Sequence, residues 1–564
     1  MDNVAGQSGA ARLQGIGMRT WRRTVASDSG DFRRAGGSWI WQTTVRMMIL
    51  WEMDSRLGHG AMLAWQKDPG AMSSSTADEA SDYPTVSCVS TDPVLALRPI
   101  LLQSAIADFR FSPKMSASNP ELLEQPQGEP APELLDGRIW VDGCWDFFHH
   151  GHAGAMVQAR QLGDELYVGV HSDEAILANK GPTVMNLEER LAATDACRWV
   201  TKSVGYAPYV TQLPYISHYG CRYVVHGDDI TSDSDGNDCY RYVKEAGRFK
   251  VVKRSPGIST TDLVGRMLLC TKTHFIKSLK KTLAGEEGVG TPEERKAQAE
   301  AMLERIKLYA TDETAKNPGV DVWFWHSAPD AGDGESGSYE KFLEGAGRKP
   351  GQRVVYVDGG FDLFSSGHIA FLRKVLEEED KLAREAGWFS AEATEKRKSA
   401  NGGKDYGPAY VVAGVHEDRV INEWKGVNYP IMNIYERGLC VLQCKYINAV
   451  VFGAPFTPTK SYLTDSPWGV PDAVYHGPTA FMPLTYDPYT APKEMGIYRQ
   501  IGEHTFSHVN AGEIVQRIMK SRDMYEARQR AKGVKAEVEA AARAREQLEE
   551  EQRKKEAERG VMSS

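Results

Sequence analysis

The chain has 564 residues, of which 41% are hydrophobic and 25% charged, and this is enough for two or more globular domains. Its formal net charge of −9 argues against a general nucleic-acid binder, which usually carries a basic surface. The eight cysteines form no ladder of pairs, and Cys440 and Cys444 have no second pair at metal-ligand spacing. No apolar run approaches the about 20 residues that span a bilayer, and no secretory signal is evident. We therefore expect a cytoplasmic protein with no integral membrane segment, no nucleic-acid partner and no metal site of its own.

Residues 1–137 show neither helical nor strand periodicity and end in the linker-like stretch QPQGEPAPELLDG. We predict a disordered N-terminal extension here. An alternative is that the natural product starts at Met115, so that the residues before it are upstream sequence.

From Arg138 the pattern changes to alternating strands and helices. The strands expected are Arg138–Val141, LYVGV, RYVVH and FKVVKR, and the helices begin near Gly151, at NLEERLAATDACRWV and at CYRYVKEAG. Such alternation requires crossover connections and predicts a parallel sheet in a doubly wound α/β domain over 138–275. The nearly continuous apolar strands suit a sheet covered on both faces.

A repeat predicts a second copy of this domain. VDGCWDFFHHGHAGA at Val141 returns as VDGGFDLFSSGHIAF at Val357, and the segments GVHSDEAI, NKG, ER and HG return in the same order as GVHEDRVI, WKG, ER and HG. The fold class expected is therefore two tandem Rossmann-like domains with parallel sheets, plus a charged C-terminal helix. The remaining boundaries predicted are a linker with a charged helix at 276–350, the second domain at 351–520 with an insertion at 381–408, and a polar helical tail at 521–564.

Two histidines, His149 and His152, follow the first strand of the first copy at a strand-to-helix turn. In an open parallel sheet, ligands bind beyond the carboxyl ends of the strands, which is where this turn falls. Gly143 and Gly151 let the backbone come close to a ligand, and a helix that starts near Gly151 directs amide donors at an anion. The pair is thus a candidate for stabilising charge on a phosphate, although a structural histidine is the alternative for each.

A second candidate anion site follows the last strand of the first copy. Ser259, Thr260 and Thr261 come at the cap and first turn of an apolar helix, after Gly257, and Arg254 supplies a fixed cation suited to phosphate. A plain helix cap without a ligand is the alternative.

Together, HHGH after VDGCWD, the lysine of NKGP, VHGDDI and RSPGIST resemble the cytidylyltransferases, whose signatures are HxGH and RTxGIST. Ser255 replaces a threonine and keeps its hydroxyl. The resemblance implies that the phosphate of a phosphorylated alcohol attacks the α-phosphorus of CTP and releases pyrophosphate, with Mg²⁺ arriving as Mg-CTP. It implies that the catalytic residues are His149, His152 and Lys180. It implies nucleotide binding by Asp142, Gly143, Cys144, Trp145, Gly151, His226, Asp228, Arg254, Gly257, Ser259, Thr260 and Thr261.

The second copy has Ser365 where the first signature histidine belongs, retains His368 and keeps no clear RTxGIST. Loss of one such donor typically costs about 100- to 1000-fold in rate, so we predict that this copy is not catalytic. The tandem arrangement resembles the branch of the family that uses phosphoethanolamine. Alternatives are the choline-phosphate branch and a non-catalytic nucleotide-binding scaffold. Class I aminoacyl-tRNA synthetases share the histidine turn, but no KMSKS-like loop is present. A homodimer is also considered.

Overall fold

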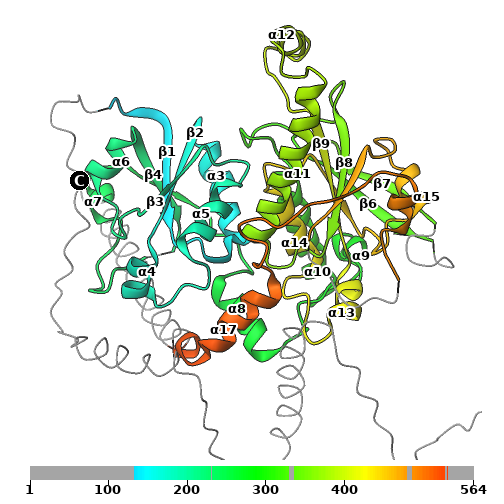
Figure 1. Ribbon diagram of the computed structural model, residues 1–564. Helices are drawn as coiled ribbons and strands as arrows, with labels where there is room; N and C mark the ends of the chain where they lie inside the picture. The colour runs from blue at the N-terminus through cyan, green and yellow to red at the C-terminus, as the bar shows by residue number, and fades with distance from the viewer. Residues whose placement is uncertain (1–131, 230, 329–335, 479–485, 528–529, 531–564) are drawn as a thin grey trace, which may run out of the picture. The chain divides into compact units, whose positions relative to one another are not determined.

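The computed structural model describes residues 132–229, 231–328, 336–478, 486–527 and 530, which form two α/β halves (Figure 1). Nearly all of the predicted N-terminal extension and of the predicted polar tail lies outside these residues. None of the helices that the structure describes combines the length and the apolar character needed to cross a membrane.

The first half contains one parallel sheet. Its strands are β1 (Leu135–Gly143), β2 (Glu165–Val170), β3 (Lys202–Gly205), β4 (Cys221–Gly227) and β5 (Phe249–Val252). They lie in the order β3-β2-β1-β4-β5 and all their pairings are parallel, as the alternating pattern predicted. The chain order reverses between β1 and β4, so the crevice at their carboxyl ends is the expected ligand position.

Helices cover both faces of this sheet and begin where the sequence supplies capping groups. They are the short 3₁₀ turn η1 (Asp146–Phe148), α3 (His150–Gln161), α4 (Asp173–Lys180), α5 (Leu187–Asp195), α6 (Leu213–His218), α7 (Arg241–Glu245) and α8 (Thr260–Leu269). The first turn of α5 is closed by a capping box, in which Asn186 and Glu189 satisfy each other's backbone amides.

The second half repeats this sheet and extends it. Its strands are β6 (Asp321–Ser327), β7 (Gly337–Leu343), β8 (Arg353–Gly359), β9 (Ala409–Val415), β10 (Ala449–Phe452), β11 (Ala473–His476) and β12 (Tyr498–Gln500). The sheet order is β12-β11-β8-β9-β10-β6-β7, in which β8 to β12 take the places of β1 to β5. The duplicated sequence therefore folds into the same topology twice.

The helices that accompany the second sheet are α9 (Leu279–Leu283), α10 (Pro292–Tyr309), α11 (Ser366–Glu385), α12 (Ala391–Ala400), α13 (Asp418–Lys425), α14 (Ile434–Leu442), α15 (Lys460–Thr464), α16 (Thr490–Glu494) and α17 (Ala511–Lys520). Figure 1 shows α12, which lies within the predicted insertion, standing away from both sheets.

The interval 276–350 is more than the predicted linker. It contains the expected charged helix, α10, but also β6 and β7, which extend the second sheet beyond β10. Six residues of β6, from Val322 to Ser327, pair with β7, which is antiparallel to it, and the register shifts between Val322 and Trp323. The repeat gave no signal for these strands, because they precede the second copy and have no counterpart in the first sheet.

The two halves pack about a pseudo-twofold relation. Helix α3 of the first half packs on α14 of the second. In the same way, α11, which corresponds to α3, packs on α5, which corresponds to α14. The backbone N–H of Arg198 donates to the carbonyl of Gln443 at 2.7 Å, and that of Lys445 donates to the carbonyl of Ala196 at 2.9 Å. These are the same two bonds with the halves exchanged, as in a symmetric dimer interface.

Two ion pairs follow the same symmetry. Arg266 of α8 forms two bonds with Glu436, at 2.7 and 2.8 Å, and Arg517 of α17 forms two bonds of the same lengths with Glu189. Each half thus sends its C-terminal helix to the capping glutamate of the other half.

Candidate active site

The two signature histidines lie against each other at the start of α3. His149 is the N-cap residue, and its Nδ1 accepts the backbone N–H of Gly151 at 3.1 Å. The imidazoles of His149 and His152 stack with ring centroids 3.9 Å apart and planes 18° apart. Because Nδ1 of His149 accepts a bond, the neutral ring carries its proton on Nε2. The pair therefore has a fixed geometry and a defined donor.

His152 is neutral at physiological pH. Burial, together with the nearby cations Arg254 and Lys180, lowers its pKa to about 3. Its ring also meets the edge of Trp145, with centroids 5.3 Å apart. A neutral imidazole at the N-terminus of a helix offers a hydrogen-bond donor, while the helix itself contributes partial positive charge.

Two cations lie at the same edge of the sheet. Lys180 is the last residue of α4, and its Nζ lies 5.7 Å from the centre of the Tyr209 ring. Arg254 follows β5, and its guanidinium lies 3.6 Å from a carboxylate oxygen of Asp229. The side chain of Arg254 is about half exposed, so it can reach a bound anion. Histidines and cations from three separate segments therefore gather beside the crevice.

The loop after β5 has the form of a helix cap. Ser259 Oγ accepts the N–H of Asp262 at 3.1 Å and donates to its carboxylate at 2.6 Å, so this hydroxyl already has partners within the chain. Thr260 and Thr261 begin α8 behind it. Gly257 has a φ of +83°, which a residue with a side chain rarely adopts, and the space beside it is open.

The acidic residues near β1 brace the turn. Asp142 is buried and accepts bonds from Trp140, Thr211 and Tyr240, at 2.8, 2.6 and 2.8 Å. Asp146 accepts the backbone N–H groups of residues 184 and 185, both at 2.9 Å. Both carboxylates thus brace the turn through bonds within the chain.

The other predicted nucleotide-binding residues surround this turn. Gly143 ends β1, and a Cβ there would lie 2.8 Å from the Trp145 ring. His226 lies at the end of β4 with its ring centroid 4.6 Å from that of Tyr240, and Asp228 accepts the N–H of Arg254 at 3.3 Å. All follow parallel strands at their carboxyl ends.

Comparison with known proteins gives the family. Residues 140–266 match the cytidylyltransferase-like family. The ethanolamine-phosphate cytidylyltransferase of Dictyostelium discoideum is 39% identical over 71% of this chain and 95% of its own length, and that of Mus musculus is 39% identical over 71% and 89%. The chain belongs to the ethanolamine-phosphate cytidylyltransferase family. Choline-phosphate cytidylyltransferase A of Rattus norvegicus is 34% identical over 31% of this chain and 48% of its own length.

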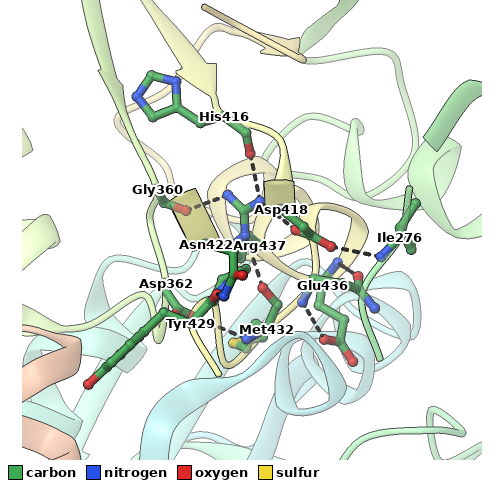
Figure 2. Close-up of polar contacts among 12 residues, drawn as sticks. Ile276, Gly360, Asp362, His416, Asp418, Asn422, Tyr429, Met432, Glu436 and Arg437 are labelled. Carbon is green, nitrogen blue, oxygen red and sulfur yellow. Dashed lines mark hydrogen bonds and ion pairs between the residues drawn. The ribbon is translucent and has the colours of Figure 1, made fainter. Parts of the chain in front are cut away.

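In this ethanolamine-phosphate cytidylyltransferase fold, a buried arginine that the sequence analysis did not single out clamps each site. Figure 2 shows Arg437, whose guanidinium donates to the carbonyls of Gly360, His416 and Met432 and to the carboxylate of Asp418. Arg190 makes the same four contacts in the first half, with Cys144, His171, Met185 and Asp173. Each arginine joins the turn after the first strand to the end of the second strand. The repeated Glu-Arg pair was the available signal, but its partners are distant in sequence.

The second half has the same strand, turn and helix at the equivalent position but lacks the histidine pair. Ser365 takes the place of His149, and its backbone N–H donates to Nδ1 of His368 at 3.2 Å. Helix α17 begins at Asn510, whose side chain accepts the amides of its first turn, so the Ser-Thr-Thr cap of α8 is absent. This geometry supports the prediction that the second copy is not catalytic.

Proposed function

We propose that the chain transfers the cytidylyl group of CTP to phosphoethanolamine, giving CDP-ethanolamine and pyrophosphate, a step of phosphatidylethanolamine synthesis. The observation that carries this proposal is the family relationship over both halves of the chain. The choline-phosphate relative, by contrast, matches less than a third of it. The gathering of His149, His152, Lys180 and Arg254 at one sheet edge supports the same reaction.

In the proposed step, a phosphate oxygen of phosphoethanolamine forms a bond to the α-phosphorus of CTP. The bond from that phosphorus to the oxygen it shares with the β-phosphorus breaks, and pyrophosphate leaves with the electron pair. No protein nucleophile is needed, so catalysis consists of positioning and charge stabilisation. His149 and His152 donate to the α-phosphate oxygens, where negative charge builds up in the transition state.

Lys180 and Arg254 neutralise the triphosphate, and the N-terminus of α8 adds partial positive charge beside it. Mg²⁺ belongs to the substrate as Mg-CTP. Among the residues that the structure describes, no three histidine, cysteine or acidic side chains converge to hold a metal. Mg²⁺ that is bound mainly by phosphates and water needs only one or two protein carboxylates, and Asp228 and Asp229 lie at this edge.

A cytoplasmic location is part of the proposal. The seven cysteines within the described ranges are all free of disulfides, which suits a reducing compartment.

The proposal is tested with the purified full-length chain, CTP, Mg²⁺ and either phosphoethanolamine or phosphocholine. We expect CDP-ethanolamine and pyrophosphate in equal amounts, and a kcat/KM that favours phosphoethanolamine. His152→Ala should reduce turnover by at least about 100-fold while the protein remains folded at the assay temperature, since it removes a transition-state donor. His368→Ala, the matched change in the second copy, should leave most activity. A preference for phosphocholine would move the chain to the choline branch, and loss of turnover in His368→Ala alone would make the second copy catalytic.

A further inference from the structure

The pseudo-twofold relation between the halves breaks next to the signature histidines. Gln443 follows α14 and corresponds to Ala196 of the first half, and both lie in the symmetric backbone contact described above. The Gln443 side chain is buried, with 2% of its surface exposed, and its Nε2 donates to the carbonyl of Phe148 at 3.2 Å. Phe148 immediately precedes His149. A side chain of the second half thus holds the backbone that begins the histidine turn of the first.

His150, which directly follows His149, is also held from outside the first half. His150 is buried, and its ring centroid lies 6.4 Å from that of Tyr435 in α14. The hydroxyl of Tyr309, at the end of α10, donates to the carbonyl of His150. Burial lowers the pKa of His150 to about 4, so the ring stays neutral within this contact. The turn is therefore anchored at two backbone carbonyls, those of Phe148 and His150, which lie on either side of His149.

Within the described ranges, the corresponding residues of the first half make none of these contacts with the second. Ala196, which corresponds to Gln443, has no polar side chain to donate. Glu188, which corresponds to Tyr435, is exposed, and Ser366 stands where His150 does. These contacts are directed toward the half that retains both signature histidines. In the opposite direction, the guanidinium of Arg198 donates to the carbonyls of Cys444 and Ile447, at 2.8 and 2.5 Å. The two halves therefore differ in their side-chain contacts, although the backbone bonds are symmetric.

We propose that Gln443 is a positioning residue for cytidylyl transfer. By holding the Phe148 carbonyl, it fixes where α3 begins and thereby where the N–H groups of His149 and His152 point. This inference rests on the proposed function. Donors aimed at developing charge lose most of their effect when they are misplaced by about 1 Å, which can cost about 100-fold in rate.

The expected effect falls on kcat. The Gln443 side chain donates to the backbone carbonyl of Phe148, and Gln443 is not among the residues proposed to bind CTP. Those contacts come from Lys180, Arg254 and the start of α8. Loss of the Gln443 bond should therefore weaken an interaction made in the transition state and leave ground-state binding nearly unchanged.

The test compares two buried glutamines in the full-length chain. Gln443→Met keeps the side-chain length but removes the donor, and we expect kcat to fall about 10- to 100-fold while KM for CTP stays within about threefold of wild type. The control is Gln352→Met. Gln352 is 5% exposed and donates to the carbonyls of Gly407 and Ala409, at 2.8 and 3.2 Å, at the amino ends of the strands of the second sheet. The Gln352→Met variant should have a lower Tm and an unchanged kcat. Gln443→Ala, which places the residue of the equivalent position 196, serves as a second variant with the same expectation.

Hydrogen exchange gives a readout that does not depend on activity. Amides of residues 149–156 should exchange faster in the Gln443 variants and unchanged in Gln352→Met, all without ligand. If kcat in both Gln443 variants stays within about twofold of wild type, or exchange in 149–156 does not change, the inference is wrong. If the wild-type chain makes no CDP-ethanolamine, the proposed function fails, while the exchange result still shows whether Gln443 holds the turn.

Discussion

Asp142 and Asp358 occupy the same position in the two halves, at the carboxyl end of the central strand of each sheet, but they have different partners. Asp142 accepts bonds from Trp140, Thr211 and Tyr240. Asp358 keeps the equivalent bond from Tyr489, at 2.6 Å, whereas Tyr356, which replaces Trp140, donates to Tyr462. With fewer donors, burial dominates and raises the pKa of Asp358 to about 7.

We predict that Asp358→Asn stabilises the protein at neutral and alkaline pH. The folded state holds the Asp358 proton up to about pH 7, whereas the unfolded state releases it near pH 4. The stability that this carboxyl contributes is therefore present in acid and is lost as pH rises toward 7. Between about pH 4 and pH 7, the free energy of unfolding of the variant should rise relative to that of wild type by up to about 1.4 kcal/mol per pH unit. Above about pH 7 this difference should stay constant.

Urea unfolding at pH 5, 6, 7 and 8 measures this difference. Asp142→Asn is the matched control, and it should destabilise by about 1–3 kcal/mol, because an amide NH₂ cannot accept the bonds that this carboxylate receives. A pH-independent difference for Asp358→Asn would contradict the assignment of its pKa.

At the scale of elements, α8 and α17 exchange equivalent ion pairs between the halves. The carboxylate of Glu189 is 1% exposed and that of Glu436 is 7% exposed, so each relies on its arginine. Arg517 also donates to the carbonyl of Val184 at 3.2 Å, and Arg266 to that of Ile431 at 3.0 Å. Each arginine therefore secures the loop that enters the capped helix of the other half.

We predict that Arg517→Met lowers the free energy of unfolding by about 2–4 kcal/mol, since it leaves Glu189 buried without its cation. The double variant Arg517→Met/Glu189→Gln should recover at least about half of this loss, because glutamine can still close the capping box without a charge. Chemical denaturation of the two variants measures both effects.

Glu513→Ala is the control for this pair. It removes the partly exposed i,i+4 partner of Arg517 in α17 and should cost less than about 0.5 kcal/mol. If the double variant is as unstable as the sum of its single changes, the buried charge does not explain the effect.

The sequence predicted these elements better than it predicted their contacts. The strand and helix alternation and the repeat at Val141 and Val357 predicted the first sheet and the equivalent five parallel strands of the second, because periodicity and repetition are local properties. β6 escaped prediction because it belongs to no repeat. The positions of His149 and His152 followed from a motif at a strand end, whereas Gln443 could not be found in this way. Its partner lies 295 residues away, and only the packing of the halves brings the two together.

At the scale of the molecule, the two halves share one buried core. The described residues belong to a single compact unit, and one contiguous apolar cluster contains Ile139 of β1 and Phe452 of β10. Neither half covers its apolar surface alone, since α3 and α5 pack against helices of the other half. The second domain, which has Ser365 in place of the first signature histidine, is therefore half of a common core.

We predict that the two halves unfold together, in one cooperative transition, because a shared core cannot be broken in one half without exposing the other. Phe452→Ala removes a fully buried ring from the second sheet and should cost about 3–5 kcal/mol. The same loss should appear in the hydrogen-exchange protection of β1, in the first half, and of β9, in the second. Phe389→Ala, at a phenylalanine that is 46% exposed, is the matched control and should change neither by more than about 0.5 kcal/mol. Calorimetry should show a single endotherm for both wild type and Phe452→Ala, with a lower Tm for the variant. Two endotherms, or a loss of protection confined to β9, would mean that the halves are separate folding units that only touch.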